Sequence, residues 1–130
     1  MAEIILLDSH IDNRGKLTVL EKKLPFSVQR IYYIYDVDNA VRGGHRHHNT
    51  IQAAICIKGS CKFYCNDGNE ENIILLDTPD KCLIIDPLDW HEMFEFSNDA
   101  ILIVFASELY NKEDYIYEPY PNSLRRPKVS

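Results

Sequence analysis

The sequence has no apolar run near the ~20 residues that a helix needs to cross a bilayer. Its first segment, MAEIILLDSH, lacks the basic start and the long apolar core of a secretory signal peptide. We therefore expect no membrane association and a cytoplasmic location. Positive charge is also scarce, since the net charge is −6 at pH 7. This balance disfavours a broad nucleic-acid surface, so nucleic acid is not an expected partner.

The sequence contains no C-x-x-C pair, the spacing that most structural zinc sites include. Disulfides are rare in the cytosol, so we expect four reduced thiols that are mostly buried. These cysteines are Cys56, Cys61, Cys65 and Cys82.

A long amphipathic helix, a repeat of fixed period and a dividing linker are also missing. Short β-branched and aromatic runs alternate instead with turn sequences such as DNRG, NDGN and DTPD. This pattern predicts one all-β domain over residues 1–130, a sandwich or a barrel, with a surface tail over 117–130. The expected strands are 4–7, 17–21, 30–36, 51–57, 61–65, 72–76, 81–85, 91–96 and 101–106, and the one helical candidate is 107–115.

Three of the five histidines lie within the segment RGGHRHHNT. His45 and His47 are two positions apart, so an extended strand turns both side chains to one face, whereas His48 points to the other. A second polar segment, PLDWHEMFEF, presents His91 at the start of another expected strand. Two distant strands that each present histidine can build a site in the mouth of a small β-barrel.

The order of these residues resembles the cupin arrangement, with a glycine-led H-x-H, a ligand position, a glycine and a later histidine. The matching positions are His45, His47, Gln52, Gly59 and His91. Metal-binding cupins usually have glutamate at the position of Gln52. Three imidazoles can still hold zinc or iron, but the anionic ligand is lost. A metal-dependent cupin enzyme is therefore the second hypothesis, and hydrogen-bonded structural histidines are another.

Four segments together resemble the sugar 3,4-ketoisomerase family: RIYYIYDV, RGGHRHHNTIQAAICIKGSCKFYCNDGNEENIILLDTP, PLDWHEMFEFS and ILIVFASELYNKEDYI. Enzymes of this family act on TDP-4-oxo-6-deoxy-D-glucose in the synthesis of unusual deoxysugars of surface glycans, such as lipopolysaccharide and S-layer glycans. The resemblance runs from about Ile5 to Tyr117, and its ordered anchors are R-G-x-H-x-H, the glutamine, N-D-G and W-H-E. The family's loop reads closer to R-G-x-H-A-H-K, so Arg46 and His48 depart from it. Both should face away from the H-x-H pair.

The resemblance implies a cupin-type jelly roll (a double-stranded β-helix barrel) and a homodimer in which N-terminal strands are exchanged. It also implies that neither a metal nor another cofactor is required, and that the partner is a TDP-sugar. The implied reaction moves the ketone from C4 to C3 through an enediol and gives a TDP-3-keto-6-deoxyhexose. We expect the galacto product, by a slight preference over gluco.

By the same resemblance, His47 would take the C3 proton and deliver it to C4. Imidazole suits this role because its unperturbed pKa of ~6.5 leaves much of it neutral near pH 7. Tyr33 would move the proton between the two oxygens, and His45 would polarise or orient the substrate. Arginine suits the pyrophosphate because its planar fork binds phosphate oxygens in pairs. The expected substrate-binding residues are Arg30, Arg42, Gln52, His91, Tyr35, Lys62 and Trp90.

Two other kinds of protein fit the same residues. A non-catalytic sugar-nucleotide-binding cupin would bind TDP through the same arginines but would not convert the ketosugar. A 3,5-epimerase of similar barrel fold would need a base that reaches both C3 and C5 of the sugar.

Overall fold

The structure is a computed structural model that describes residues 2–121. In this range it contains twelve β-strands and one short 3-10 helix, η1 (Lys112–Asp114), so the predicted all-β class is confirmed. No helix among these residues is of a length and apolarity suited to crossing a membrane. The strands are β1 (Glu3–Leu6), β2 (Asp8–Asp12), β3 (Gly15–Val19), β4 (Arg30–Tyr35), β5 (Arg42–His47), β6 (Gln52–Lys58), β7 (Cys61–Asn66), β8 (Glu71–Leu76), β9 (Lys81–Ile85), β10 (Trp90–Phe94), β11 (Ile101–Ala106) and β12 (Tyr115–Ile116).

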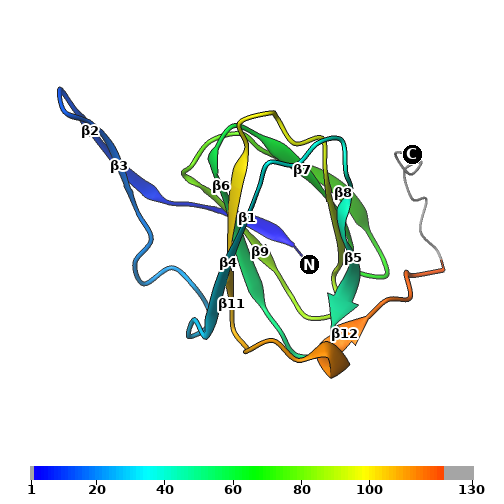
Figure 1. Cartoon of the computed structure of the whole chain (residues 1–130). Coiled ribbons are helices and arrows are strands. Elements are labelled where there is room, and N and C mark those ends of the chain that lie inside the picture. Colours follow the sequence, from blue (N-terminus) through cyan, green and yellow to red (C-terminus); the bar gives the residue numbers. More distant parts are fainter. Residues whose placement is uncertain (1, 122–130) are drawn as a thin grey trace.

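Two five-stranded sheets face each other and form a barrel (Figure 1). One has the strand order β1-β9-β6-β11-β4 and the other β12-β5-β10-β7-β8. All the pairings are antiparallel, and most neighbours in space are distant in the sequence. This is the jelly-roll architecture, so the predicted cupin-type fold is confirmed. Exchange of N-terminal strands between subunits stays a prediction.

The main hydrophobic core lies between the two sheets. Strand β11 shows how the sequence builds it, because Leu102 and Val104 point inward and are buried in this core. Their neighbours Ile103 and Phe105 lie on the outer face of the same sheet and belong to a second cluster, as the two-residue period of a strand requires. All four cysteines are free and buried, as predicted.

The connection between β3 and β4 covers this outer cluster. Leu20, Leu24 and Phe26 pack against the buried side chains of Ile55 and Ile84. The first sheet is therefore buried on both faces over part of its area. This explains why β6 reads as a nearly continuous apolar run rather than an alternating one.

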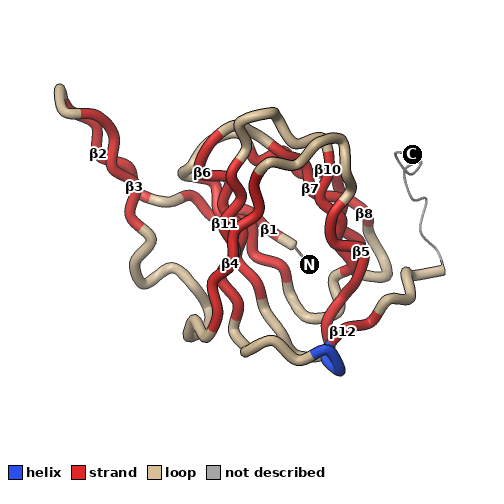
Figure 2. The backbone as a smooth tube through the Cα atoms, viewed as in Figure 1, coloured by secondary structure: helices blue, strands red, loops and turns tan. Residues whose placement is uncertain are grey.

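The hairpin formed by β2 and β3 extends away from the barrel (Figures 1 and 2). Among the described residues, its two strands pair only with each other. Every residue of β2 is exposed, including Ile11 at 71%, and Leu17 of β3 is 58% exposed. The predicted turn DNRG joins the two strands, and NDGN joins β7 to β8. The hairpin is thus a formed element that contributes little to the barrel of its own chain.

The helix predicted over residues 107–115 is wrong. The segment contains only η1 (Lys112–Asp114), capped by the side chain of Asn111, and continues into β12. It pairs with β5 instead, with Tyr115 opposite His47. Residues 117–121 follow the surface, where the Tyr120 hydroxyl donates to the carbonyl of Leu88. The rest of the expected tail, 122–130, lies outside the described residues.

Candidate active site

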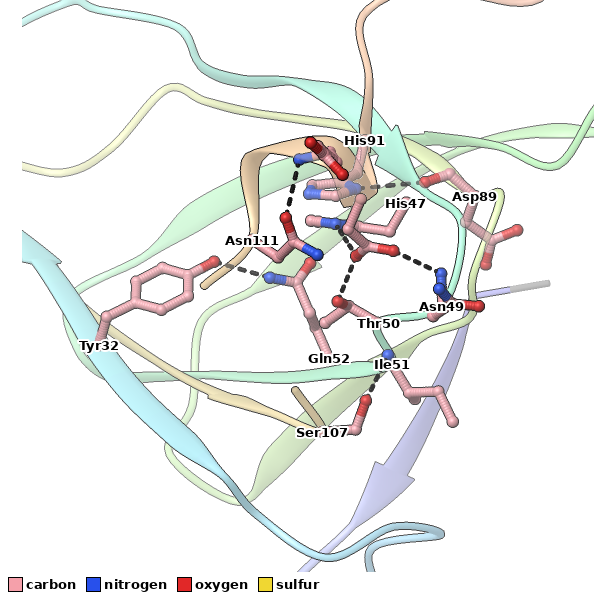
Figure 3. Close-up of polar contacts among 12 residues, drawn as sticks. Tyr32, His47, Asn49, Thr50, Ile51, Gln52, Asp89, His91, Ser107 and Asn111 are labelled. Carbon is pink, nitrogen blue, oxygen red and sulfur yellow. Dashed lines mark hydrogen bonds and ion pairs between the residues drawn. The ribbon is translucent and has the colours of Figure 1, made fainter. Parts of the chain in front are cut away.

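Three histidines from two adjacent strands converge inside the barrel, and Figure 3 shows two of them, His47 and His91. His45 and His47 share one face of β5, and His91 of β10 lies directly opposite His45 in the strand register. The ring centroids are 5.0 Å apart for His45 and His47, 4.8 Å for His45 and His91, and 6.0 Å for His47 and His91. The predicted convergence of the H-x-H pair with a later histidine is therefore observed.

Glycine at position 43 allows the two strands to approach. Its φ is +81°, a left-handed backbone conformation that glycine adopts readily. A Cβ atom placed there would lie 2.9 Å from the carbonyl oxygen of His91. The glycine that precedes the H-x-H motif therefore serves the geometry of the site.

Asp114 holds His47 in a fixed orientation. Its Oδ2 atom lies 2.9 Å from His47 Nδ1 and also accepts the hydroxyl of Thr50, while Oδ1 accepts the backbone N–H of Asn49 at 2.7 Å. Because a carboxylate only accepts hydrogen bonds, Nδ1 of the neutral imidazole carries the hydrogen. Nε2 then holds a lone pair, and this buried atom has no hydrogen-bond partner among the described residues.

Asp114 is not among the site residues expected from the sequence. It lies 67 residues from His47, so no motif spacing links the two residues. The pairing of β12 with β5 brings them together. The only available signal was that the segment SELYNKEDYI belongs to the family resemblance.

A tyrosine and an amide form the second polar contact of the site. Gln52 Nε2 donates to the hydroxyl of Tyr32 at 2.9 Å (Figure 3), and the Arg30 guanidinium lies 5.1 Å from the Tyr32 ring centroid. Burial is the largest cause that raises the pKa of Tyr32 to about 12. The phenol is therefore protonated at neutral pH and able to donate its hydrogen.

The three imidazoles are neutral at pH 7. Burial is the main cause for each, and it lowers the pKa of His45 to about 3 and those of His47 and His91 to about 4. Neighbouring imidazoles lower these pKa values further, whereas Asp114 acts in the opposite direction on the pKa of His47. His45 is half-buried, but His47 and His91 are only 3% and 1% exposed. Of the three residues, His45 is the least buried.

Several of the predicted binding residues lie beside the histidines. Gln52 is buried on the inner face of β6, and His91 completes the histidine cluster. Arg30 is half-buried, with a buried Nε that has no partner among the described residues. Arg42 is exposed at the start of β5, and its charge lowers the pKa of Tyr32.

The other predicted residues lie elsewhere. Tyr33 and Tyr35 are exposed on the outer face of β4, with ring centroids 6.0 Å apart, and Tyr33 is 63% exposed. Strand alternation turns Tyr32 inward and Tyr33 outward.

Trp90 also lies away from the histidine cluster. Strand alternation places its side chain on the face of β10 opposite to that of His91. There the indole donates a hydrogen bond to Glu92 and packs with Tyr64 and Phe94. Lys62 pairs with Glu95 at 2.7 Å.

A comparison with models of protein families identifies the family of this chain. The profile described as "FdtA: WxcM-like, C-terminal" matches residues 1–123. The chain belongs to this family. The FdtA/WxcM-like assignment agrees with the resemblance to sugar 3,4-ketoisomerases that the sequence motifs gave.

Individual relatives of this FdtA/WxcM-like chain carry specific names. It is 41% identical over 117 residues to the TDP-4-oxo-6-deoxy-α-D-glucose-3,4-oxoisomerase of Aneurinibacillus thermoaerophilus, covering 88% of this chain and 84% of the relative. It superposes with a TM-score of 0.85 and 42% identity on a 3,4-ketoisomerase from Helicobacter canadensis, covering 90% of each chain. It superposes equally well, at 40% identity, on a mutant of the 3,4-ketoisomerase QdtA from Thermoanaerobacterium thermosaccharolyticum in complex with TDP-4-keto-6-deoxyglucose. That alignment covers 90% of this chain and 87% of QdtA.

Proposed function

We propose that this protein is a sugar-nucleotide 3,4-ketoisomerase that converts TDP-4-keto-6-deoxy-D-glucose into a TDP-3-keto-6-deoxyhexose. The observation that carries the proposal is a set of neutral imidazoles and a protonated phenol gathered in one barrel, in a chain related to enzymes of that name. These groups can accept and donate protons at neutral pH, which is what an enediol reaction needs.

The reaction requires two proton movements and no external oxidant. A base removes the proton from C3, the C3–C4 double bond forms, and O4 gains a proton to give the enediol. The hydroxyl on C3 then loses its proton, the C3 ketone forms, and C4 receives a proton from the base. Hydrogen and electrons therefore stay within the substrate and the groups around it.

His45 suits the role of the carbon base better than His47, to which the sequence resemblance assigned that role. His47 is bound to Asp114, whose carboxylate stabilises the imidazolium form and so suits His47 to the oxygen transfer. His45 lies beside it, with 5.0 Å between the ring centroids, and is the less buried residue. Its lowered pKa keeps the imidazole neutral, with a lone pair available at neutral pH.

His47 and Tyr32 suit the transfer between the two oxygens. Asp114 fixes the imidazole of His47 so that Nε2 carries the lone pair. Gln52 donates to the oxygen of Tyr32, which leaves the phenol hydrogen free to reach a substrate oxygen. In this role Tyr32 takes the place that the sequence resemblance gave to Tyr33.

Arg30 and Arg42 are the proposed partners of the diphosphate. Both lie near Tyr32, and their charges act on the pKa of its phenol. The buried Nε of Arg30 has no hydrogen-bond partner among residues 2–121, so its hydrogen is available to a ligand. Arginine binds phosphate oxygens through paired, charge-assisted hydrogen bonds. We expect Gln52 and His91 to line the sugar site between these arginines and the catalytic groups.

The direct test is an NMR spectrum of TDP-4-keto-6-deoxyglucose after incubation with the purified protein, with an aminotransferase added to trap the 3-keto product. We expect a 3-keto sugar. The galacto configuration at C4 stays a prediction, and the same spectrum reports it through a small H4–H5 coupling, against a large one for gluco. Unchanged substrate would indicate a binding protein, and inversion at C3 or C5 would indicate an epimerase.

The two adjacent tyrosines provide a matched pair of variants. Tyr32→Phe removes the hydroxyl that Gln52 contacts, and we expect turnover to fall about 10²-fold because an acid–base group is lost. Tyr33→Phe removes an exposed hydroxyl on the outer face, and turnover should be nearly unchanged. Steady-state rates for both variants measure this, and the reverse order of effects would restore Tyr33 to the mechanism.

We also propose that the protein is a homodimer in which the hairpin of β2 and β3 packs on the partner subunit. An isolated two-stranded hairpin is only marginally stable in water, yet this one is well formed and carries the exposed side chains of Ile11 and Leu17. A second copy would cover both the apolar side chains and the open strand edges.

Replacing Ile11 and Leu17 together by serine should shift the protein towards the monomer, because the apolar contact area is lost. Light scattering coupled to size-exclusion chromatography measures the mass. The matched control replaces Ile73 and Leu75 by serine. Both side chains are exposed on β8, and the mass of the particle should be unchanged. A wild-type monomer, or a dimer that only the control variant breaks, would contradict the exchanged hairpin.

A further inference from the structure

The histidine cluster has the geometry of a metal site as well as that of a proton relay. One ligand atom from each of His45, His47 and His91 can be chosen so that all three lie within 4.8 Å of one another. Nitrogens bound to a tetrahedral zinc ion are about 3.3 Å apart, given Zn–N bonds of about 2.0–2.1 Å. A bound ion would therefore have to draw the three nitrogens closer together than they lie in the structure.

In two of the three imidazoles, those of His47 and His91, one nitrogen is already hydrogen-bonded in the way that is typical of metal-binding histidines. His47 Nδ1 is bonded to Asp114 at 2.9 Å, and His91 Nδ1 to the backbone carbonyl of Asp89 at 3.2 Å. The backbone of Gly43 acts to raise the pKa of His45 against the effect of burial. Hydrogen bonds such as those of His47 and His91 fix the tautomer and direct the other nitrogen, with its lone pair, toward a metal. Nε2 of His47 is buried, has no hydrogen-bond partner within residues 2–121, and is available for this bond.

We propose that His45, His47 and His91 bind one divalent transition-metal ion, Zn²⁺ foremost, and that the loaded protein is inactive. The inhibitory half of this proposal rests on the proposed isomerase function, because the metal would occupy the lone pairs that proton transfer uses. The binding half does not depend on that function.

The donor set also indicates which ions would bind and how firmly. Three imidazole nitrogens suit Zn²⁺, Co²⁺ and Ni²⁺, whereas Mg²⁺ and Ca²⁺ prefer oxygen ligands. Cupins that hold a catalytic metal add a glutamate, and this chain has Gln52, whose amide nitrogen donates to Tyr32. Within the part of the chain that the structure describes, the group of possible ligands contains no carboxylate, so the site should exchange its ion with a chelator. A fourth position remains for water or a substrate oxygen.

The test begins with chelator-treated, dialysed protein of the full chain. Titration calorimetry with ZnCl₂ should give one strong site per chain, and addition of CoCl₂ should give the visible absorption bands of a four- or five-coordinate ion. Both signals should be lost in His91→Gln. They should persist in the control variant His48→Gln, which changes the exposed histidine adjacent to the cluster. Asp114→Asn should keep the site but weaken Zn²⁺ binding by about 10–100-fold, because the orienting carboxylate is gone.

The activity measurement separates the two proposals. Stoichiometric Zn²⁺ should abolish turnover of the TDP-ketosugar, and excess EDTA should restore it in full. Absence of binding in calorimetry, or equal binding in His91→Gln, would overturn the metal site. Turnover that rises with Zn²⁺ would overturn inhibition and indicate a metal-dependent enzyme. If the chelator-treated protein showed no turnover with or without added metal, the isomerase proposal would be contradicted. The Co²⁺ absorption spectrum would still show whether the three histidines bind a metal ion.

Discussion

Replacing His45 by asparagine is expected to lower turnover of TDP-4-keto-6-deoxyglucose by about 10³-fold while the affinity for TDP is retained. Removal of a general base typically costs 10²–10⁴-fold in rate, and here the same base both takes and returns the carbon-bound proton. Asparagine fills a similar space but has no basic nitrogen. Product formation by NMR gives the rate, and titration calorimetry with TDP gives the affinity.

Proton exchange separates the roles of the two histidines. In D₂O the wild-type protein should catalyse incorporation of deuterium at C3 of the substrate, and His45→Asn should not. His47→Asn should stop isomerisation but keep this exchange, because the carbon base is still present. His48→Asn is the matched control, since its side chain is exposed. Exchange that survives in His45→Asn and is lost in His47→Asn would return the carbon base to His47.

The sequence was sufficient to predict the histidine cluster because its signal is local. Alternation along an extended strand placed His45 and His47 on one face, and it also placed Tyr32 on the same face as Arg30. The resemblance to the family favoured Tyr33, but in the structure the strand period turns Tyr33 outward. Where residue alternation and family resemblance disagree on a short strand, the alternation is the better guide to which side chains meet.

The contributions of the C-terminal segment were not predictable in this way. Asp114 reaches His47 only because β12 pairs with β5, and this pairing joins residues far apart in the sequence. The segment also has a modest helical pattern, which tertiary pairing overrides. The jelly roll itself was predictable because turn sequences and short apolar runs mark its strands. The independent hairpin of β2 and β3 needed the structure, since its apolar residues pack on no core of the described chain.

Asp114→Asn should lower kcat about 10²-fold with little change in KM, an effect on the scale of losing one acid–base group. The amide can place an N–H against His47 Nδ1, which would move the imidazole hydrogen to Nε2 and fill the lone pair that the oxygen transfer requires. Asp114 also acts to raise the pKa of His47 against the effect of burial, which lowers it to about 4. Loss of the carboxylate removes a charge that stabilises the imidazolium, so the pKa of His47 should fall further. The acid limb of the rate profile governed by His47 should move to lower pH.

The pH profile distinguishes this positioning role from a merely structural one. A variant that only loosened the fold would lose activity at every pH without moving the acid limb. Glu113→Gln is the matched control, because it removes the adjacent acidic side chain of η1, which is exposed. It should leave both the rate and the profile unchanged. If Asp114→Asn kept the wild-type kcat, or lost activity with an acid limb that had not moved, then Asp114 would not set the state of His47 during turnover.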